Sequence, residues 1–537
     1  MDFMAATSES LSEASSCPRA DAMSERPPGE ALARLRAHAE RVPVLGAITR
    51  AGYKAVVRRP ALHRALRPLA LSAVVWLRPP LRWLYIASTR TATVLTGWVE
   101  LPLAASRFLQ AWYGSGRKGV GTQALGRTIV MVVVADMRVD PRVQREARAL
   151  VAGGYHVHVI WTDPQLGPGG AQPEIDWGAN ISFEALPRDA GRFSSQFPGF
   201  LGRRLLKAAL AHRPFAFHGH DLNTALVVLT AARRTGSHAV CDFHEWYSEN
   251  VTFAPLSGVY RPHSPPQKAV YRWLERLSFR HGSALVTVCD TIAEEMERDL
   301  GDGRLGVAVV RNIPDRSREP SRAYLPLKQQ YGIPESQFAL LWQGGVGPSR
   351  MIEPVVEALA HAPGCTLVIR GPEIETYGPG YAAIAARIGA ADRLILAPAV
   401  PSRDVVVAGR GADAGVWTLP NLCKNFTYAL PNKIFEYLSS GLPVVVAHYP
   451  EAKRLVETHE VGLDFDPYDP RSIAAAINRL SGDRSLRDRL AANTGTALER
   501  LDADAEWRKL VTLYDRLPRR GGDDGRVEPR DVPVAAS

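Results

Sequence analysis

A lysine and a glutamate lie about one helical turn apart within residues 425–446, NFTYALPNKIFEYLSSGLPVVV. The pattern predicts a helix that starts at Leu430-Pro431, where the missing N–H of proline is not needed. A helix start offers unpaired N–H groups and a partial positive charge, which suit a diphosphate. Lys433 would add a full charge, and Glu436 would accept hydrogen bonds from a ribose diol. The alternative is an ordinary helix–strand unit with a surface lysine and glutamate.

The residues around this pair predict the elements that would position it. Ile434, Phe435 and Leu438 recur at helical spacing and form one apolar face. Gly441 then ends the helix. The apolar, β-branched run 442–447 follows, and this composition is typical of a strand buried in a parallel sheet.

Alternating strands and helices begin at residue 127. The apolar run 128–135 predicts a first strand, a helix follows it, and residues 156–161 form the second strand of a βαβ unit. No glycine-rich dinucleotide fingerprint follows the first strand, which argues against a dehydrogenase.

Polar residues follow three later strands of this run, predicted at 215–218, 239–242 and 307–310. In open α/β sheets, ligands bind at that edge. A single histidine there would be an ordinary buried residue, whereas several such strand ends together favour a binding site. The residues concerned are His218, His220-Asp221, His244-Glu245 and Arg311-Asn312.

A charged, proline-bearing break at 314–326 precedes a second α/β run. Its first strand, 338–342, leads into a glycine-rich loop at 344–347, and its second, 366–369, leads into Arg370-Gly371. Further strands are predicted at 394–396, 414–417 and 442–446. A single last helix is expected over 497–517, with five residues toward the core: Leu501, Trp507, Leu510, Val511 and Leu513.

The composition is that of a globular protein, with 46% hydrophobic and 22% charged residues among 537. The five cysteines, at 17, 241, 289, 365 and 423, form no CxxC pair and no Cys/His cluster. Their spacing therefore indicates neither a zinc site nor a disulfide framework, and a reducing cytosol is expected.

The net charge of +10 is concentrated in one segment. Residues 31–127 hold 16 Lys and Arg against 2 Asp and Glu, whereas residues 128–537 are neutral overall. The basic pI thus belongs to this segment and not to the main body, which argues against nucleic acid as a partner of the main body.

The amino-terminal region divides into two parts. Residues 1–30 are expected to be disordered and lack the pattern of a signal peptide. In residues 31–125, arginines are mixed with tryptophans and tyrosines, and the apolar runs 69–77 and 91–99 are shorter than the ~20 residues that span a bilayer. This mixture favours helices lying on an anionic membrane surface. The alternative is a helical extension packed on the rest of the chain or within an oligomer.

Eight segments, in order, carry a family resemblance: DMRVDPRVQREARAL, HGHDLNTA, CDFHEWYSEN, VVRNIPD, WQGGVGPSRMIE, VIRGPE, GADAGVWTLPN and PNKIFEYLSSGLPVVV. Together they resemble the retaining glycosyltransferases of family 4 (glycosyl transferases group 1) over residues 128–517, about 70% of the chain. The resemblance implies an α/β, GT-B fold: two Rossmann-like domains facing a central cleft, here with a basic helical extension at the amino terminus.

The domain boundaries expected from this reading are an acceptor domain at 126–313, a linker at 314–326 and a donor-binding domain at 327–497. A closing helix at 498–517 and a disordered tail at 518–537 complete the chain.

The resemblance also assigns roles on the donor side. It implies that Glu436 contacts the donor ribose and that Arg350, assisted by Lys433, lies beneath the diphosphate. It places the nucleobase edge near Arg370 and Gly371. The remaining donor-side residues are Gly344, Gly345, Tyr428, Leu430, Pro431 and Asn432. Two of these depart from the family pattern: Tyr428 stands where the family has a further glutamate, and Gly345 stands where it has an arginine.

On the other side of the site, the resemblance assigns His244 to the sugar and the reacting centre. Residues expected to face the acceptor are Asp136, Arg138, His220, Asp221 and Glu245.

The implied activity is that of a retaining hexosyltransferase, which moves a sugar from a nucleotide-diphosphate sugar to an acceptor hydroxyl. Synthesis of a glycolipid, lipid-linked saccharide or exopolysaccharide is the expected context, in the cytoplasm and peripherally on the inner face of the plasma membrane. No cofactor beyond the nucleotide sugar and no metal are expected, because no DxD pair follows a predicted strand. The alternatives are a non-catalytic GT-B partner that binds nucleotide and docks on membrane, and a sugar-nucleotide epimerase.

Overall fold

The computed structural model describes residues 126–518, except 139, 164, 168–169, 188–197, 255–258, 315–319 and 348. The predictions for residues 1–30, 31–125 and 519–537 lie outside the described residues. The chain separates into two units, 1–89 and 90–537, and every element below belongs to the second unit.

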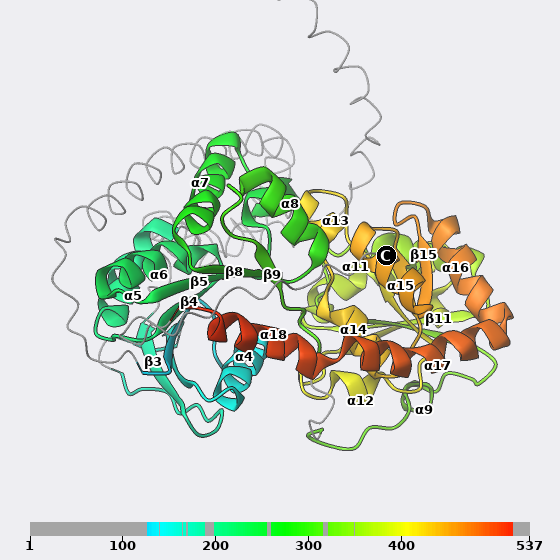
Figure 1. Cartoon of the computed structure of the whole chain (residues 1–537). Helices are drawn as coiled ribbons and strands as arrows, with labels where there is room; N and C mark the ends of the chain where they lie inside the picture. Colours follow the sequence, from blue (N-terminus) through cyan, green and yellow to red (C-terminus); the bar gives the residue numbers. More distant parts are fainter. Residues whose placement is uncertain are drawn as a thin grey trace, which may run out of the picture. The chain divides into compact units, whose positions relative to one another are not determined.

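The first domain is built on a parallel sheet of seven strands in the order β3-β2-β1-β4-β5-β8-β9 (Figure 1). Its central strands are almost fully buried apolar runs, as expected where helices cover both faces of a parallel sheet. The strands are β1 (Thr128–Val133), β2 (His156–Asp163), β3 (Ile181–Pro187), β4 (Ala216–His220), β5 (His238–Phe243), β8 (Ala284–Thr287) and β9 (Val307–Val309).

Helices connect these strands, and one antiparallel hairpin projects from the domain. The helices are α4 (Pro141–Ala152), α5 (Pro198–Ala209), α6 (Leu222–Thr235), α7 (Pro265–His281) and α8 (Asp290–Leu300). The hairpin consists of β6 (Val251–Ala254) and β7 (Val259–Pro262). No prediction was made for β3, α5, α6, α7 or the hairpin.

The second domain contains a parallel sheet of six strands in the order β12-β11-β10-β13-β14-β15. Its strands are β10 (Phe338–Gln343), β11 (Cys365–Gly371), β12 (Leu394–Pro398), β13 (Ala414–Trp417), β14 (Val444–Ala447) and β15 (Gly462–Phe465). The helices are α9 (Leu327–Tyr331), α10 (Glu353–Glu357), α11 (Ile374–Arg387), α12 (Val405–Gly409), α13 (Lys424–Tyr428), α14 (Asn432–Ser439), α15 (Pro450–His459) and α16 (Pro470–Gly482).

In both sheets the strand order reverses next to the first strand of the domain, between β1 and β4 and between β10 and β13. Ligands of open α/β sheets bind beyond the carboxyl ends of the strands at such a reversal. The predicted α/β architecture of two Rossmann-like domains is therefore confirmed, and the two reversals mark where a site is expected.

The last helix differs from the prediction. Two helices, α17 (Arg484–Leu501) and α18 (Ala503–Asp515), replace the single helix expected over 497–517. They meet at Asp502, which has a left-handed backbone (φ 36°) and accepts a hydrogen bond from Ala505 N at 3.0 Å. The helical spacing of apolar residues continues across this break, so periodicity alone does not reveal it.

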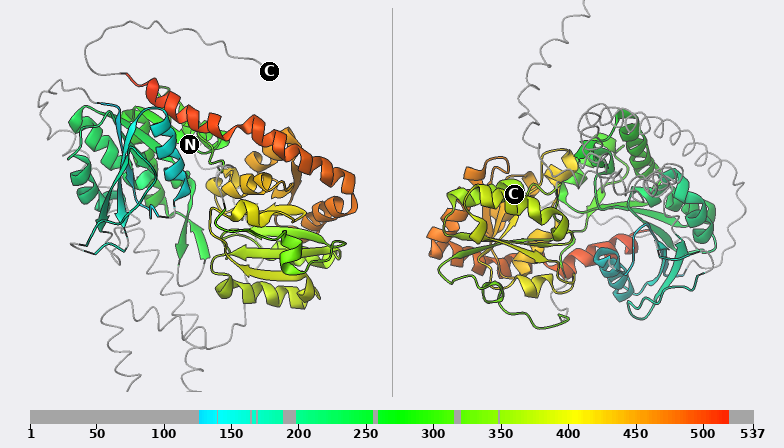
Figure 2. Two further views of the ribbon diagram at one scale, coloured as in Figure 1. Left: turned by 90° about the horizontal axis from the view of Figure 1, so that it is seen from below. Right: turned by 180° about the vertical axis from the view of Figure 1, so that it is seen from behind.

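The two last helices serve different domains (Figure 2). α17 packs on α14 of the second domain, whereas α18 packs on α4 and β9 of the first. Trp507 and Leu510 are buried, as predicted, and Tyr514 is a further fully buried residue of α18. The chain thus crosses back to its first domain before it ends.

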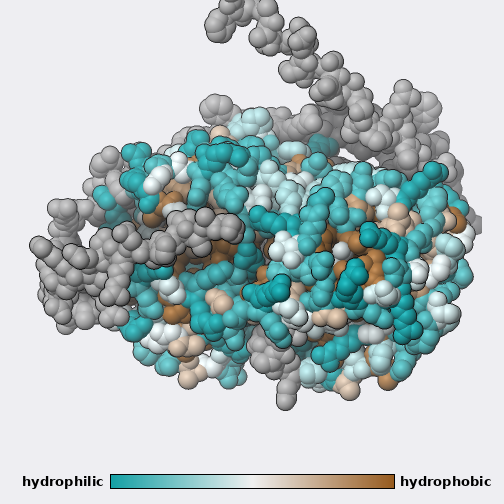
Figure 3. Space-filling view, turned by 45° about the vertical axis from the view of Figure 1, so that its right-hand side comes forward, coloured by the Kyte–Doolittle hydropathy of each residue, from teal (hydrophilic) through white to brown (hydrophobic). Residues whose placement is uncertain are grey.

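No helix among the described residues combines the length and the apolar character that a bilayer crossing requires. On the face drawn in Figure 3, the described surface is mainly hydrophilic, and hydrophobic side chains show mostly in its hollows.

Candidate functional site

The start of α14 is where the lysine–glutamate pair predicted a diphosphate site. α14 begins at Asn432, with Pro431 before it in an extended conformation (φ −79°, ψ 151°), one residue later than the sequence suggests. No side chain of the described residues caps this start. Its first-turn N–H groups, together with the positive end of the helix dipole, are therefore suited to an anion.

The loop after β10 packs directly against this helix start. Gly344 has a positive φ of 111°, and a Cβ built on it would lie 2.2 Å from Cε of Lys433. A Cβ on Gly371 would lie 1.9 Å from the carbonyl oxygen of Gly344. Only glycine fits at either position, because the neighbouring atoms lie so close. The loop backbone therefore packs tightly against both the end of β11 and the stem of Lys433.

Two cations lie together beside this group. A Cβ on Gly345 would lie 3.3 Å from Nε of Arg350, so the arginine covers the loop. Burial and the neighbouring charge of Arg350 lower the pKa of Lys433 to about 8, against the opposing effect of Glu436. Two like charges held close at an uncapped helix start are costly without an anion, and a diphosphate would relieve that repulsion.

Two successive hydrogen bonds connect Glu436 to the interior of the second domain. Gln343 Nε2 donates to Glu436 Oε2 at 3.5 Å, and Arg370 Nη2 donates to Gln343 Oε1 at 2.5 Å. Burial raises the pKa of the Glu436 carboxyl, while Lys433 opposes this shift. Glu436 therefore lies close to Lys433, which in turn lies close to Arg350.

Arg370 was predicted to lie near the nucleobase edge. Its side chain is 1% exposed, and Nη1 donates to Ala408 O at 2.9 Å. The guanidinium thus supports Gln343 inside the domain, and its charge also lowers the pKa of Glu436 against the effect of burial. A nucleobase contact by Arg370 remains a prediction.

Arg145, on α4 of the first domain, is a candidate site residue that sequence reasoning missed. Its charge lowers the pKa of Glu436, against the effect of burial, so the two side chains lie near one another. Arg145 Nη1 also donates to Asn312 Oδ1 at 2.5 Å. Two features of the sequence could have pointed to Arg145: it lies within the motif DMRVDPRVQREARAL, and its partner Asn312 was already named among the polar residues that follow a predicted strand.

The predicted histidines of the first domain do come together, at the ends of β4 and β5. His220 Nδ1 lies 3.3 Å from His244 Nε2, and the same His244 nitrogen lies 3.3 Å from Asp242 Oδ2. On its other side, His244 Nδ1 lies 3.5 Å from Asp221 Oδ1. The four side chains form one network, in which only His244 and Asp221 reach the surface.

The charge of His244 follows from this network. Burial disfavours the imidazolium, but Asp221 and Asp242 outweigh burial and raise the pKa of His244 to about 9. Burial also opposes ionisation of Asp242, but Arg142 and His244 hold the pKa of that carboxyl well below its usual range. His244 is therefore a cation at neutral pH, able to donate a hydrogen bond to a sugar oxygen or to a developing negative charge.

Further buried side chains pack beneath His220 and His244, and of these Arg142, Glu146 and Tyr514 were not predicted. Arg142 Nη2 lies 3.2 Å from Asp242 Oδ2, and His218 Nδ1 is paired with the Tyr514 hydroxyl at 2.7 Å. Burial and the charge of Asp242 raise the pKa of Glu146 well above its usual range, although Arg142 Nε lies only 2.8 Å from Glu146 Oε1. The upward direction follows from the full burial of the Glu146 side chain, which disfavours the charged carboxylate.

These buried side chains bear on whether the histidines hold a metal. Donor atoms of Glu146, His220, Asp242 and His244 lie within 4.8 Å of one another. Arg142 and His244 already place two positive charges beside Asp242 in that space. The donor set therefore fits a hydrogen-bonded network that shares protons better than a divalent ion.

The remaining predicted residues are more scattered. Arg138 Nη2 pairs with Asp163 at 2.6 Å and Arg138 Nε with Asp136 at 2.8 Å, beside the ring of Trp161 at 5.4 Å. Glu245 is exposed and accepts from Asn250 Nδ2 at 2.5 Å.

Two predicted donor-side residues precede α14. Tyr428, the last residue of α13, is half-buried, and its carbonyl oxygen accepts from Cys289 Sγ at 3.2 Å. Leu430 packs in the core. Neither residue makes a described contact with the cations at the helix start.

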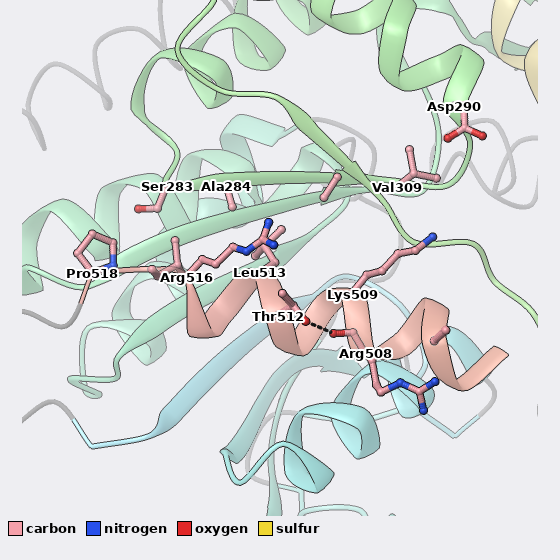
Figure 4. A pocket seen from close by; sticks show the side chains of 13 residues that line it. Ser283, Ala284, Asp290, Val309, Arg508, Lys509, Thr512, Leu513, Arg516 and Pro518 are labelled. Atoms are coloured by element: carbon pink, nitrogen blue, oxygen red, sulfur yellow. Dashed lines mark hydrogen bonds between the residues drawn. The ribbon is translucent and has the colours of Figure 1, made fainter. Parts of the chain in front are cut away.

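A hollow of about 830 Å³ lies elsewhere, between α18 and strands β8 and β9 (Figure 4). Ser283, Ala284 and Val309 line one side, and Lys509 and Arg516 project from the helix. None of the predicted site residues lines it, so it is separate from the candidate site.

Two protein-family models match the chain, one in each domain. The model described as "Glycosyl transferase 4-like domain" matches residues 139–312, and the model described as "Glycosyl transferases group 1" matches residues 347–483. Together they cover more than half of the chain. The chain belongs to the GT-B glycosyltransferases.

Characterised relatives of this GT-B chain are distant. It is 24% identical over 245 residues to alpha-D-kanosaminyltransferase of Streptomyces kanamyceticus, covering 42% of this chain and 58% of that protein. It is 29% identical over 205 residues to D-inositol 3-phosphate glycosyltransferase of Acidothermus cellulolyticus, covering 36% of this chain and 44% of that one. The matches span about half the length of these relatives.

Solved structures agree on the fold. Sucrose-phosphate synthase of Thermosynechococcus elongatus superimposes with a TM-score of 0.56 at 16% identity, covering 73% of this chain and 98% of that one. Anabaena HepE in complex with UDP gives a TM-score of 0.54 at 16% identity, covering 73% and 100%. At this identity the likeness establishes the GT-B fold alone.

Proposed function

We propose that this protein transfers a sugar from a nucleotide-diphosphate sugar to an acceptor hydroxyl. The observation that carries the proposal is the pair of cations, Lys433 and Arg350, beside the uncapped start of α14. A departing nucleotide diphosphate gains negative charge in the transition state. Fixed cations and N–H donors placed at that position would lower the barrier most effectively.

The donor site is proposed around these cations. The backbone of Gly344 and Gly345 would approach the phosphates, and Glu436 would accept hydrogen bonds from the ribose hydroxyls. Anabaena HepE, a protein of the same fold, has been solved with UDP and with UDP-glucose, which supports a nucleotide sugar as the donor class.

The acceptor and the reacting sugar are proposed to meet the residues at the ends of β1, β4 and β5. His244, as a cation, would donate to the sugar, with Asp221, Glu245, Asp136 and Arg138 toward the acceptor. We propose retention at the anomeric carbon of a hexose, with a diphosphate oxygen of the leaving group taking the acceptor proton on the same face.

The proposal needs no metal. Lys433, Arg350 and the helix start would together supply the positive charge that a divalent ion supplies in other nucleotide-sugar enzymes. We therefore expect turnover to persist in a strong chelator.

The acceptor class is inferred from the amino-terminal region. The basic and aromatic composition of residues 31–125 supports contact with an anionic membrane surface. A lipid-linked saccharide, a glycolipid or an exopolysaccharide precursor, met on the inner face of the plasma membrane, is the acceptor we propose.

A panel of nucleotide sugars tests the proposal on the full-length chain. A donor at about 100 times its dissociation constant adds about 2.7 kcal/mol to the free energy of unfolding, which thermal shift detects. The donor that stabilises the protein is then incubated without acceptor. Slow release of free sugar would support a transferase. Its loss in Lys433→Met but not in Lys453→Met, at a half-buried lysine on α15, would locate the site.

Two other outcomes would contradict the proposal. Tight nucleotide binding with no sugar release and no transfer to any hydroxyl acceptor would indicate a non-catalytic partner. Conversion of the donor into another nucleotide sugar would indicate an epimerase.

A further inference from the structure

Two histidines and a glutamate meet at the edge of the first sheet, away from the proposed transfer site. His158 lies on β2, Glu184 lies on the neighbouring edge strand β3, and His212 follows α5. Glu184 Oε2 lies 3.8 Å from His158 Nε2 and 3.7 Å from His212 Nε2. The two imidazole rings face each other with centroids 4.4 Å apart.

The orientation of His158 is fixed by its other ring nitrogen. His158 Nδ1 is hydrogen-bonded to Ser182 Oγ at 2.8 Å, across the β2–β3 register. This leaves Nε2 directed at Glu184, and that nitrogen is buried and makes no hydrogen bond within the described structure. Histidines that bind metals are held in the same way, with the second ring nitrogen hydrogen-bonded to a neighbour.

The protonation state of His158 also suits a ligand. Burial, and then the neighbouring charge of His212, lower the pKa of His158, which favours the neutral imidazole that metals bind. Two imidazoles and one carboxylate form a donor set that zinc and other divalent first-row metals accept. Metal–ligand bonds of about 2.0–2.1 Å place tetrahedral donors about 3.3 Å apart, so small rotations of Glu184 and His212 would close the site.

We propose that His158, Glu184 and His212 form a binding site for a divalent transition metal, with zinc as the preferred ion. The site takes one ligand from an interior strand, one from the edge strand and one from the turn after a helix. A bound ion would cross-link β3 to β2 and to the end of α5. It would therefore stabilise the edge of the sheet, where pairing is otherwise least protected.

The test uses full-length protein without a polyhistidine tag, stripped of metal by a chelator and then freed of the chelator. Zinc affinity is measured by competition with a chromophoric chelator, and stability is measured by thermal unfolding with and without zinc. We expect a zinc-dependent rise in Tm of several degrees. His212→Asn and Glu184→Gln should each weaken zinc binding at least about tenfold and remove most of that rise.

Matched controls separate this site from other histidines. His361→Asn, at an exposed residue of the second domain, should bind zinc like the wild type. His220→Asn tests the buried donor group of the proposed transfer site. Comparison of the metal-free Tm of each variant with that of the wild type shows whether the variant folds. If His212→Asn does not fold, Glu184→Gln still tests the site, because glutamine keeps the shape of the side chain.

Three results would overturn the proposal. The first is a wild-type protein whose Tm and chelator competition do not respond to zinc. The second is equal zinc affinity in wild type, His212→Asn and Glu184→Gln. The third is loss of zinc binding in His220→Asn but not in His212→Asn, which would place the ion at the strand-end cluster.

Discussion

The stem of Lys433 fills the space that a side chain on Gly344 would need, since a Cβ on Gly344 would lie 2.2 Å from Lys433 Cε. The glycine at the end of β10 and the lysine in the first turn of α14 are therefore fitted to each other. The contact fixes where the ammonium group can lie, close to Arg350 and beside the start of the helix.

Gly344→Ala should disrupt this fit. The new methyl group would displace Lys433, and a non-glycine residue at φ 111° costs about 1–2 kcal/mol in backbone strain. We expect nucleotide-sugar affinity to fall at least about tenfold and Tm to drop, measured by calorimetry and thermal unfolding. Gly364→Ala is the control, because a Cβ there meets no atom within 4 Å. Wild-type affinity in Gly344→Ala would show that the lysine position does not matter for binding.

Binding of a nucleoside diphosphate should weaken as pH rises through about 8. The pKa of Lys433 in the ligand-free protein is about 8, so its positive charge is present below that pH and lost above it. The diphosphate favours the charged form, so the protein should take up a proton on binding near pH 8–9, measured by calorimetry in buffers of different ionisation enthalpy. Lys433→Arg should flatten the pH profile, since arginine stays charged. An unchanged profile in that variant would assign the titration to another group.

Loss of Glu436 or Arg350 should affect turnover most. We expect Glu436→Ala and Arg350→Ala each to lower kcat/KM by about 10²-fold or more, as when other groups that stabilise transition-state charge are removed. Glu457→Ala and Arg484→Ala remove exposed side chains elsewhere in the domain and should stay near wild type. Near-normal rates in both site variants would remove this site assignment.

Asp221→Asn should lower the pKa of His244. Asp221 is the first of the two carboxylates that raise this pKa to about 9, so without it the ring would lose its proton at a lower pH. Asp221 holds a strained backbone conformation (φ 68°, ψ 162°), and asparagine, which has nearly the same size and shape as aspartate, adds no new steric conflict there, so the fold should persist. The shift is read from the His244 ring proton in an NMR titration and from an alkaline limb of the rate profile that moves to lower pH. Asp302→Asn, in an exposed pair with Arg304, is the control. The same His244 titration in both variants would contradict the assignment.

The amino-terminal region should bring the protein to anionic membranes. Full-length protein should float with vesicles containing anionic lipid, less so at high salt, whereas Δ1–120 protein should stay in the soluble fraction. Equal recovery of the two proteins with the vesicles would end the membrane proposal and favour the extension packed elsewhere.

The sequence by itself determined the features that depend on neighbouring residues. The apolar runs at β1 and β14, the helix start before Lys433 and the alternation of strands and helices all follow from local periodicity, because side-chain direction repeats every 2 or 3.6 residues. The order of strands and helices then predicts parallel sheets, and polar residues at strand ends predict a site at one edge.

Only the tertiary structure decided which distant side chains share a space. In the folded protein Arg370 donates a hydrogen bond to Gln343, and Arg145 lies near Glu436. Tyr514, near the end of the described chain, is hydrogen-bonded to His218. Cysteine and histidine spacing indicated no zinc site, yet the proposed ligands His158, Glu184 and His212 come from separate elements that the sheet order places together. The spacing of residues along the sequence does not predict such contacts, because they depend on the order of the strands and the packing of the helices in the folded protein.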